Sequence, residues 1–166
     1  MEIIEFKIRR FKELIKGILL GDGARWSFVR LNVVDYVLDG FQFTNKSHVT
    51  NSNRINKDTI LYKILSIKND SNDILSMIDL NILDDDTLMY SFLKEKNILI
   101  GVSLHRDDVF YVGKVKTINL KSFVLDTYDA QLKKSGDMTI EFNKVRFIQI
   151  HTDYLDSLSL LLDNNK

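Results

Sequence analysis

Two stretches of this sequence, nearly a hundred residues apart, carry the same residues in the same order. The run SFV at residues 27–29 returns at 122–124, and NK at 45–46 returns at 143–144, so the two copies lie 95 to 98 residues apart. Self-similarity at a fixed spacing indicates a repeated structural unit, with chance similarity between hydrophobic strands as the alternative. We therefore expect a first unit with a C-terminal helix at 1–68, a helical connector at 69–97 and a second unit with a C-terminal helix at 98–166.

Turns in this chain must form without proline, because the sequence has 7 Gly and 0 Pro. The pair Asp39-Gly40 lies between the apolar-rich runs VVDYVL and FQFT. A tight type I′ turn needs positive φ at both central positions, and Asp-Gly tolerates this well. The pattern predicts a β-hairpin that turns at Asp39-Gly40, and a second hairpin that turns at Gly136-Asp137.

Three segments combine a capping signal with apolar residues at helical spacing. Asp58 or Thr59 precedes the run 60–65, Asp84 to Asp86 precede 88–93, and Thr152 or Asp153 precedes 154–162. The sequence therefore predicts a mainly β protein with flanking helices, of the α+β class. The buried stripe predicted for the middle helix consists of Leu88, Met89, Phe92 and Leu93.

The second copy also carries a resemblance to a known fold. The run GKVKTINLKSFVLDTYD, which begins at Gly113, resembles the bent strand pair of a small Sm-like β-barrel, in which a glycine lets the backbone turn the corner. Together with NKVRFIQIHTDYLDSLSLLL and DYVLDGFQFTNKSHV, it is similar to uncharacterised proteins of low-GC Gram-positive bacteria that carry paired small-barrel units. The resemblance implies a tandem of duplicated Sm-like barrels joined by the connector, and it implies no activity.

Composition and motifs argue against several functions. Lys plus Arg and Asp plus Glu both number 23, so no net field attracts polyanions or acidic membranes. There are 0 Cys, and neither a G-x-S-x-G motif nor a glycine-rich phosphate loop occurs. The N-terminus has no continuous apolar stretch typical of a secretion signal. We expect no enzyme, no cofactor, no metal, no membrane partner and a cytoplasmic location.

The three histidines stand far apart, and none has the spacing of a metal site. In the alignment of the two copies, His48 falls opposite Arg146, which favours an outward position on a strand. His151 precedes Thr152 and Asp153, where its ring can hydrogen-bond a helix cap. We therefore expect structural roles for these side chains.

The function that this pattern favours is non-catalytic protein binding, as an adaptor or an inhibitor such as a toxin-immunity or phage-related protein, in a monomer or dimer. The loops and edges of small barrels bind partners in this way. The candidate contact residues are Trp26, Tyr36, Asp39, Phe41 and Tyr128.

Two other functions stay open. Basic residues interleaved with aromatic residues favour single-stranded RNA, which binds by stacking and by backbone neutralisation. A cleft between the two units could instead bind a small ligand or hydrolyse one. The residues proposed for RNA are Lys7, Arg9, Arg10, Lys46, Arg54, Lys144 and Arg146.

Overall fold

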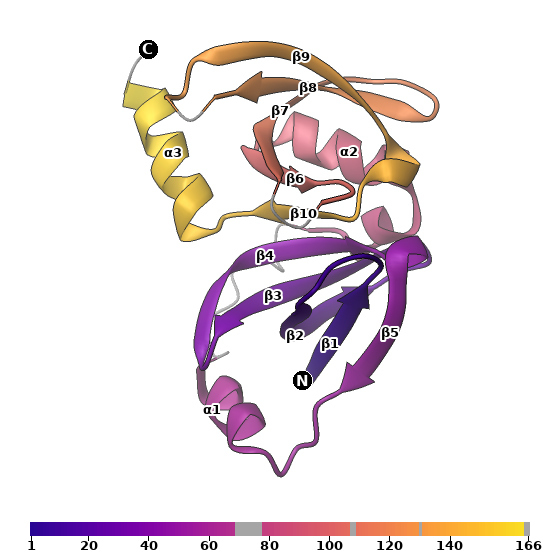
Figure 1. Ribbon diagram of the computed structural model, residues 1–166, viewed down its shortest axis with the longest axis vertical. Helices are drawn as coiled ribbons and strands as arrows, with labels where there is room; N and C mark the ends of the chain where they lie inside the picture. Colours follow the sequence, from indigo (N-terminus) through magenta and orange to yellow (C-terminus); the bar gives the residue numbers. More distant parts are fainter. Residues whose placement is uncertain (69–77, 107–108, 130, 165–166) are drawn as a thin grey trace.

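A computed structural model describes residues 1–68, 78–106, 109–129 and 131–164. Its strands form one open antiparallel sheet in the order β5-β1-β2-β3-β4-β10-β6-β7-β8-β9 (Figure 1). The predicted mainly β, α+β character is confirmed. The strands are β1 (Glu2–Ile8), β2 (Leu14–Asp22), β3 (Trp26–Val34), β4 (Val37–Asn45), β5 (Val49–Arg54), β6 (Ile100–Ser103), β7 (Phe110–Ile118), β8 (Ser122–Tyr128), β9 (Lys134–Glu141) and β10 (Phe147–Ile150).

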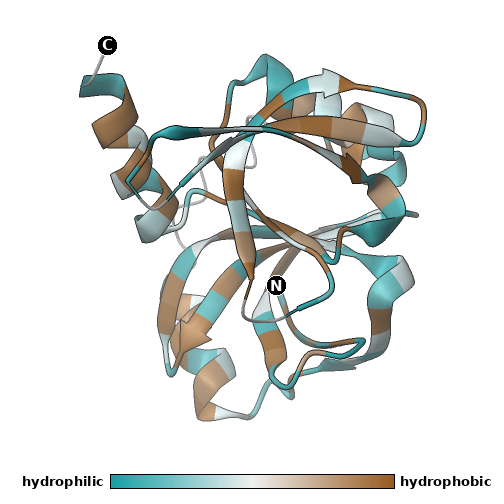
Figure 2. Ribbon diagram, turned by 45° about the horizontal axis from the view of Figure 1, so that its top comes forward, coloured by the Kyte–Doolittle hydropathy of each residue, from teal (hydrophilic) through white to brown (hydrophobic). Residues whose placement is uncertain are grey.

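Helices and short 3-10 turns complete the chain. The helices are α1 (Ile60–Lys68), α2 (Asp86–Glu95) and α3 (Asp153–Asn164), and the 3-10 turns are η1 (Lys46–His48), η3 (Leu80–Asp84) and η4 (Phe142–Lys144). No helix among the described residues is long and apolar enough to cross a membrane. Apolar and polar residues alternate along many of the strands (Figure 2), as expected where one face of a sheet is buried.

The two halves of the sheet have the same strand order and the same register. The order β5-β1-β2-β3-β4 recurs as β10-β6-β7-β8-β9. Gly17 pairs with Leu31 and Gly113 pairs with Thr127, so both partners lie 96 positions further along the chain. The other ladders keep the same displacement: Ile4 opposite Arg54 corresponds to Ile100 opposite Ile150. Even the irregularity in β2 returns at the equivalent place in β7.

This register corrects the alignment drawn from the sequence. A displacement of 96 places Lys144, and not Arg146, at the position equivalent to His48, because η1 and η4 are the matching turns. The spacing of 98 inferred from the repeated NK dipeptides is therefore wrong at that point. The backbone pairing of the strands determines which residues of the two halves are equivalent, and the identity of the side chains reflects that pairing only weakly.

β4 and β10 join the two halves (Figure 1). Phe41 lies opposite Ile150, and Phe43 lies opposite Ile148. These positions are apolar, whereas the outer strands β5 and β9 have the polar sequences VTNSNR and KSGDMTIE. Each half thus pairs its apolar border strand, β4 or β10, with that of the other half.

The main core crosses this join. Trp26, Phe28 and Phe43 from the first half belong to the same buried cluster as Phe123 and many second-half residues. α2 contributes Tyr90, whose ring stacks on Phe123 at 4.2 Å and on Phe142 at 4.9 Å between centroids. Its hydroxyl is buried and has no hydrogen-bond partner among the residues that the structure describes.

The predicted turn at Asp39-Gly40 is wrong. The chain reverses between Val34 and Val37, with Asp35 at φ 45°. Asp39-Gly40 lies inside β4, where the register shifts and Gly40 has φ 61°. The pair forms a β-bulge, which requires the same left-handed backbone as a hairpin turn and so has the same local sequence signal.

The second predicted turn, at Gly136-Asp137, is displaced in the same way. β8 and β9 reverse between Asp129 and Lys133, where the Asp129 carboxylate accepts hydrogen bonds from the backbone nitrogens of Gln131 and Lys133. Gly136, at φ 120°, lies in β9 beside a register shift. It occupies the position equivalent to Gly40, since both pairs of strands keep the displacement of 96.

The helix caps agree with the sequence. The side chains of Thr59, Asp85 and Thr152 each accept a hydrogen bond from the backbone nitrogen three residues later, within the first turn of the helix. One detail of the middle helix was wrong: Leu88 is exposed and Tyr90 is buried instead. The helical spacing of apolar residues did not distinguish the two, because tyrosine has an apolar ring and a polar hydroxyl and so fits either face of a helix.

Candidate functional site

A groove of about 510 Å³ opens on the sheet face where the two halves meet. The turn after β1 supplies Phe11, and β2 and β3 supply Leu14, Ile15, Leu31 and Val33. β4 supplies Gln42, and β10, across the join, supplies Phe147 and Gln149. The groove therefore exists only because β4 and β10 are paired. Its complete lining is Phe11, Lys12, Glu13, Leu14, Ile15, Lys16, Leu31, Asn32, Val33, Gln42, Phe147 and Gln149.

The floor of the groove combines two aromatic rings with a hydrogen-bonded chain of polar side chains. Phe11 and Phe147 are buried and meet edge to face with ring centroids 5.7 Å apart. Beside them, the Gln149 side-chain amide donates to Gln42 Oε1 at 3.1 Å, and Gln42 in turn donates to Thr44 at 2.9 Å. This amide chain fixes polar groups at the join, so they are held in place within an apolar surface.

One wall of the groove carries exposed apolar side chains. Leu14 is 46% exposed and Val33 is 53% exposed, although both are large and apolar. The neighbouring β3–β4 reversal adds Val34, Tyr36 and Val37, which are also exposed. Exposed apolar groups gathered beside a groove are typical of a surface that another molecule covers.

The five residues predicted as protein contacts do not form one surface. Trp26 is fully buried, which corrects the prediction that it is exposed, because its indole nitrogen donates to Asp86 at 2.9 Å inside the core. Phe41 stacks on Phe28 with centroids 5.6 Å apart. Asp39 is engaged with α3, and Tyr128 packs at the far end of the second half. Only Tyr36 lies beside the exposed apolar wall.

The groove residues were not singled out from the sequence. Phe11 and Phe147 come from opposite ends of the chain, and nothing local distinguishes them from core phenylalanines. The repeat was the one sequence feature that bears on the groove. It defines the two halves, and the pairing of β4 with β10 then determines which side chains meet at the join.

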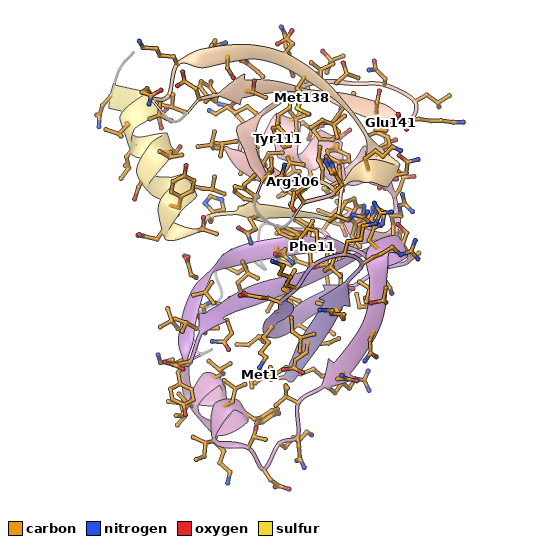
Figure 3. The ribbon with its side chains drawn as sticks, in the orientation of Figure 1. Met1, Phe11, Arg106, Tyr111, Met138 and Glu141 are labelled. Atoms are coloured by element: carbon orange, nitrogen blue, oxygen red, sulfur yellow. The ribbon has the colours of Figure 1, made fainter. Side chains whose placement is uncertain are left out.

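A second feature adjoins the groove. Arg9 and Arg10 immediately precede Phe11, Arg146 immediately precedes Phe147, and His48 ends η1. The Arg9 backbone nitrogen donates to the His48 carbonyl at 2.9 Å. We call Arg9, Arg10, His48 and Arg146 the arginine cluster. In Figure 3, side-chain nitrogens gather at one edge of the junction between the halves, beside the level of Phe11.

His48 and Arg146 are bonded to one another within this cluster. His48 Nε2 donates to the Asn143 carbonyl at 2.7 Å, which leaves Nδ1 to accept from Arg146 Nη1. The sequence-based expectation of an outward strand position for His48 is therefore wrong. Burial lowers the pKa of His48, and the neighbouring arginine cations act in the same direction, against the Asn143 hydrogen bond. A neutral imidazole thus holds a charged guanidinium.

Arg146 itself is only 8% exposed. Its Nε donates to the Leu104 carbonyl at 3.1 Å. Burial lowers the pKa of the Arg146 guanidinium, and the cations of Arg10 and Arg9 contribute further. The described residues place no carboxylate in an ion pair with Arg9, Arg10 or Arg146.

The remaining residues proposed for RNA are dispersed. Lys7 donates to the Lys12 carbonyl, Lys46 pairs with Asp22 at 3.1 Å, and Arg54 pairs with Glu2 at 3.3 Å. Lys144 is exposed in η4. The structure thus brings together three of the seven, namely Arg9, Arg10 and Arg146.

Comparison of the chain with known protein families, with curated proteins and with solved structures gave no significant match. The site must therefore be interpreted from its own geometry. Within the described parts of the chain, no three His, Asp or Glu side chains are grouped as metal ligands.

A smaller hollow of about 240 Å³ lies near the start of α2, lined by Arg25, Asp86, Leu120, Lys121, Glu141, Phe142 and Asn143. Its central acid, Asp86, already accepts from Arg25 at 3.1 Å and from Trp26 at 2.9 Å. Asp86 is thus committed to holding α2 against the first half.

Proposed function

We propose that this chain is a non-catalytic protein-binding module, an adaptor or an inhibitor, and that the groove across β2, β3 and β10 holds an extended segment of the partner protein. The observation that carries the proposal is the wall formed by Leu14 and Val33, which stays about half exposed above a floor of buried aromatic rings. Covering such a wall removes apolar surface from water, which is the main source of affinity in protein association.

A polypeptide segment suits the shape of this surface. The groove is open, and its lining runs from the turn after β1 across β2 and β3 to β10. Such an elongated surface suits an extended chain better than a compact small molecule. The rim carries both signs, with Lys12, Lys16 and Glu13, so we expect a segment whose apolar residues are flanked by charged ones.

We also infer that the two halves are duplicated copies of one Sm-like small-barrel unit. The common strand order and the constant displacement of 96 support this inference. On this view the protein is similar to the paired small-barrel proteins of low-GC Gram-positive bacteria, acts in the cytoplasm, and has a role of the toxin-immunity or phage-related kind.

Site-specific photo-crosslinking tests the groove. A photoreactive residue replaces Val33 in one variant and Leu120 in another, because Leu120 is 90% exposed and lies outside the groove. Both are expressed in cells of the source organism. The proposal expects one protein adduct from position 33 that is absent from position 120 and is lost when Leu14→Asp is added.

The partner identified in this way is then purified and its binding measured directly. Leu14→Asp and Val33→Asp should each weaken binding by about tenfold or more, since each places a charge against apolar surface. Leu120→Asp serves as the matched control and should leave the affinity unchanged. Equal affinities for all three variants would refute the groove as the docking surface.

A further inference from the structure

We infer that the arginine cluster is a binding site for a phosphate group. This site is distinct from the groove, and it does not depend on which protein segment the groove holds. Arg9 and Arg10 lie in the turn after β1, and Arg146 lies just before β10. The two segments meet at His48, whose carbonyl accepts from the Arg9 backbone nitrogen and whose ring accepts from the Arg146 guanidinium. No carboxylate among the described residues pairs with these three arginines.

Arg146 is the fixed member of the site. The backbone holds it on both sides: its nitrogen donates to the Ser103 carbonyl, and its carbonyl accepts from Asn45, each at 2.9 Å. Its guanidinium donates to the Leu104 carbonyl and to His48. These partners are neutral, so they orient the cation without compensating its charge. The described residues supply no further acceptor for this guanidinium, and its other N–H groups can donate to a ligand.

His48 contributes position. Its Nε2 is occupied by the Asn143 carbonyl, so its ring orientation and tautomer are determined before any ligand arrives. The Arg9 backbone is bonded to the same residue through the His48 carbonyl. His48 thereby connects the turn after β1, which carries the long side chains of Arg9 and Arg10, to the buried Arg146. Arg9 and Arg10 are exposed and can close over a ligand seated on Arg146.

The charge of the cluster favours phosphate over carboxylate. Grouped cations that repel one another, one of them buried, are unfavourable until an anion binds. A carboxylate has two oxygens and one charge, whereas a phosphate group has more oxygens and up to two charges, which suits three guanidinium forks better. The group could belong to free phosphate or to the backbone of a single-stranded nucleic acid, and the experiment separates these sources.

The test follows the side-chain NMR signals of the three histidines in the intact protein. Sodium phosphate is titrated against sodium chloride at constant ionic strength and pH. Phosphate binding should shift the His48 signal saturably while His151, which lies just before α3, stays unchanged. Arg9→Gln with Arg10→Gln should weaken binding by about tenfold or more, equivalent to ~1.4 kcal/mol.

A charge-matched control separates the site from the general field of the protein. Arg54→Gln with Lys57→Gln removes the same two charges at exposed positions on the other end of β5 and beyond it. This variant should bind phosphate as the wild type does. Equal weakening in both double variants would show a diffuse charge effect and would overturn the site. Arg146→Lys, which keeps the charge but loses the fork, should also weaken binding.

Two further probes identify the source. The first probe is a fluorescent 12-nucleotide single-stranded RNA. If it binds more tightly than free phosphate, and if the log–log slope of its salt dependence decreases by roughly one to two in the Arg9→Gln, Arg10→Gln variant, the group belongs to a nucleic acid backbone. Binding of free phosphate without RNA assigns it to a small ligand. The inference is overturned if neither probe perturbs His48, or if polyglutamate of equal charge binds as well as phosphate or RNA.

Discussion

The carboxylate of Asp39 accepts a hydrogen bond from the backbone nitrogen of Asp153, 2.7 Å away and 114 residues later in the chain. Asp153 is the first residue of α3, so a side chain from the first half caps the terminal helix of the second. The bulge at Gly40 allows β4 to approach the start of α3, because the backbone of Thr152 lies directly against this glycine. A feature interpreted from sequence as a hairpin turn is thus a contact between the two halves.

Removing this cap should destabilise the protein. We expect Asp39→Ala to lower the free energy of unfolding by about 0.5–2 kcal/mol, because α3 loses an N-terminal hydrogen-bond acceptor. Asp39→Asn should recover most of the loss. Urea unfolding followed by circular dichroism measures both. Asp58→Ala, at an exposed aspartate, is the control and should change stability by less than about 0.5 kcal/mol.

The two bulge glycines form a matched pair for a second test. Both have positive φ, but a Cβ on Gly40 would lie 2.5 Å from the Thr152 nitrogen, whereas a Cβ on Gly136 would meet no atom of the described residues within 4 Å. Gly136→Ala should therefore cost only the backbone strain, about 1–3 kcal/mol. Gly40→Ala should cost clearly more, because the Thr152 backbone cannot yield. Similar losses for the two variants would show that Thr152 moves freely.

The buried hydroxyl of Tyr90 predicts an unusual result for a core substitution. Because that hydroxyl has no partner within the described part of the chain, Tyr90→Phe should leave the protein at least as stable as the wild type, with a gain of up to about 1–3 kcal/mol. Tyr62→Phe, whose hydroxyl donates to the Met1 carbonyl at 3.0 Å on the surface, should change little. A loss above about 1 kcal/mol in Tyr90→Phe would mean that the hydroxyl has a partner.

His48 should make stability depend on pH. Its pKa is lowered in the folded protein by burial, so the unfolded chain binds the proton more tightly. The stabilising contribution is complete above pH 6.5, the unfolded value, and is lost as the pH falls through the lower folded pKa. The difference in unfolding free energy between wild type and His48→Gln should therefore shrink between pH 7.5 and pH 5.

Chemical denaturation at three pH values in that range measures this difference. His105→Gln is the control for removing a histidine from an exposed position. A wild-type advantage over His48→Gln that grows towards pH 5 would reverse the sign of the linkage and contradict the assigned hydrogen bonds.

The sequence predicted elements well where the signal is local. Thr59, Asp85 and Thr152 cap the helices as expected, because a capping side chain acts within three residues of its partner. It failed at Asp39-Gly40, because positive φ is equally required by a hairpin turn and by a bulge. In the structure the pair lies in a bulge, from which Asp39 accepts a hydrogen bond from α3, more than a hundred residues away.

The site was harder to predict than the fold. Trp26 was expected on the surface, but a carboxylate on α2 lets its indole be buried without losing a hydrogen bond. Phe11 and Phe147 become neighbours only when β4 pairs with β10. Arg9, Arg10 and Arg146 were named from the sequence, but the dispersed lysines named with them show that composition alone did not separate the cluster.

The pairing of β4 with β10 also affects how copies of this protein behave towards each other. It places Phe41, Phe43, Ile148 and Ile150 inside the molecule, and the outer borders of the described sheet keep polar strands such as β5, with its run of Asn51, Ser52 and Asn53. Polar border strands discourage edge-to-edge growth. Repeated sets of strands could in principle pair edge to edge from copy to copy and form a filament. Here the apolar border strands pair within one molecule, so the sheet stops after two sets.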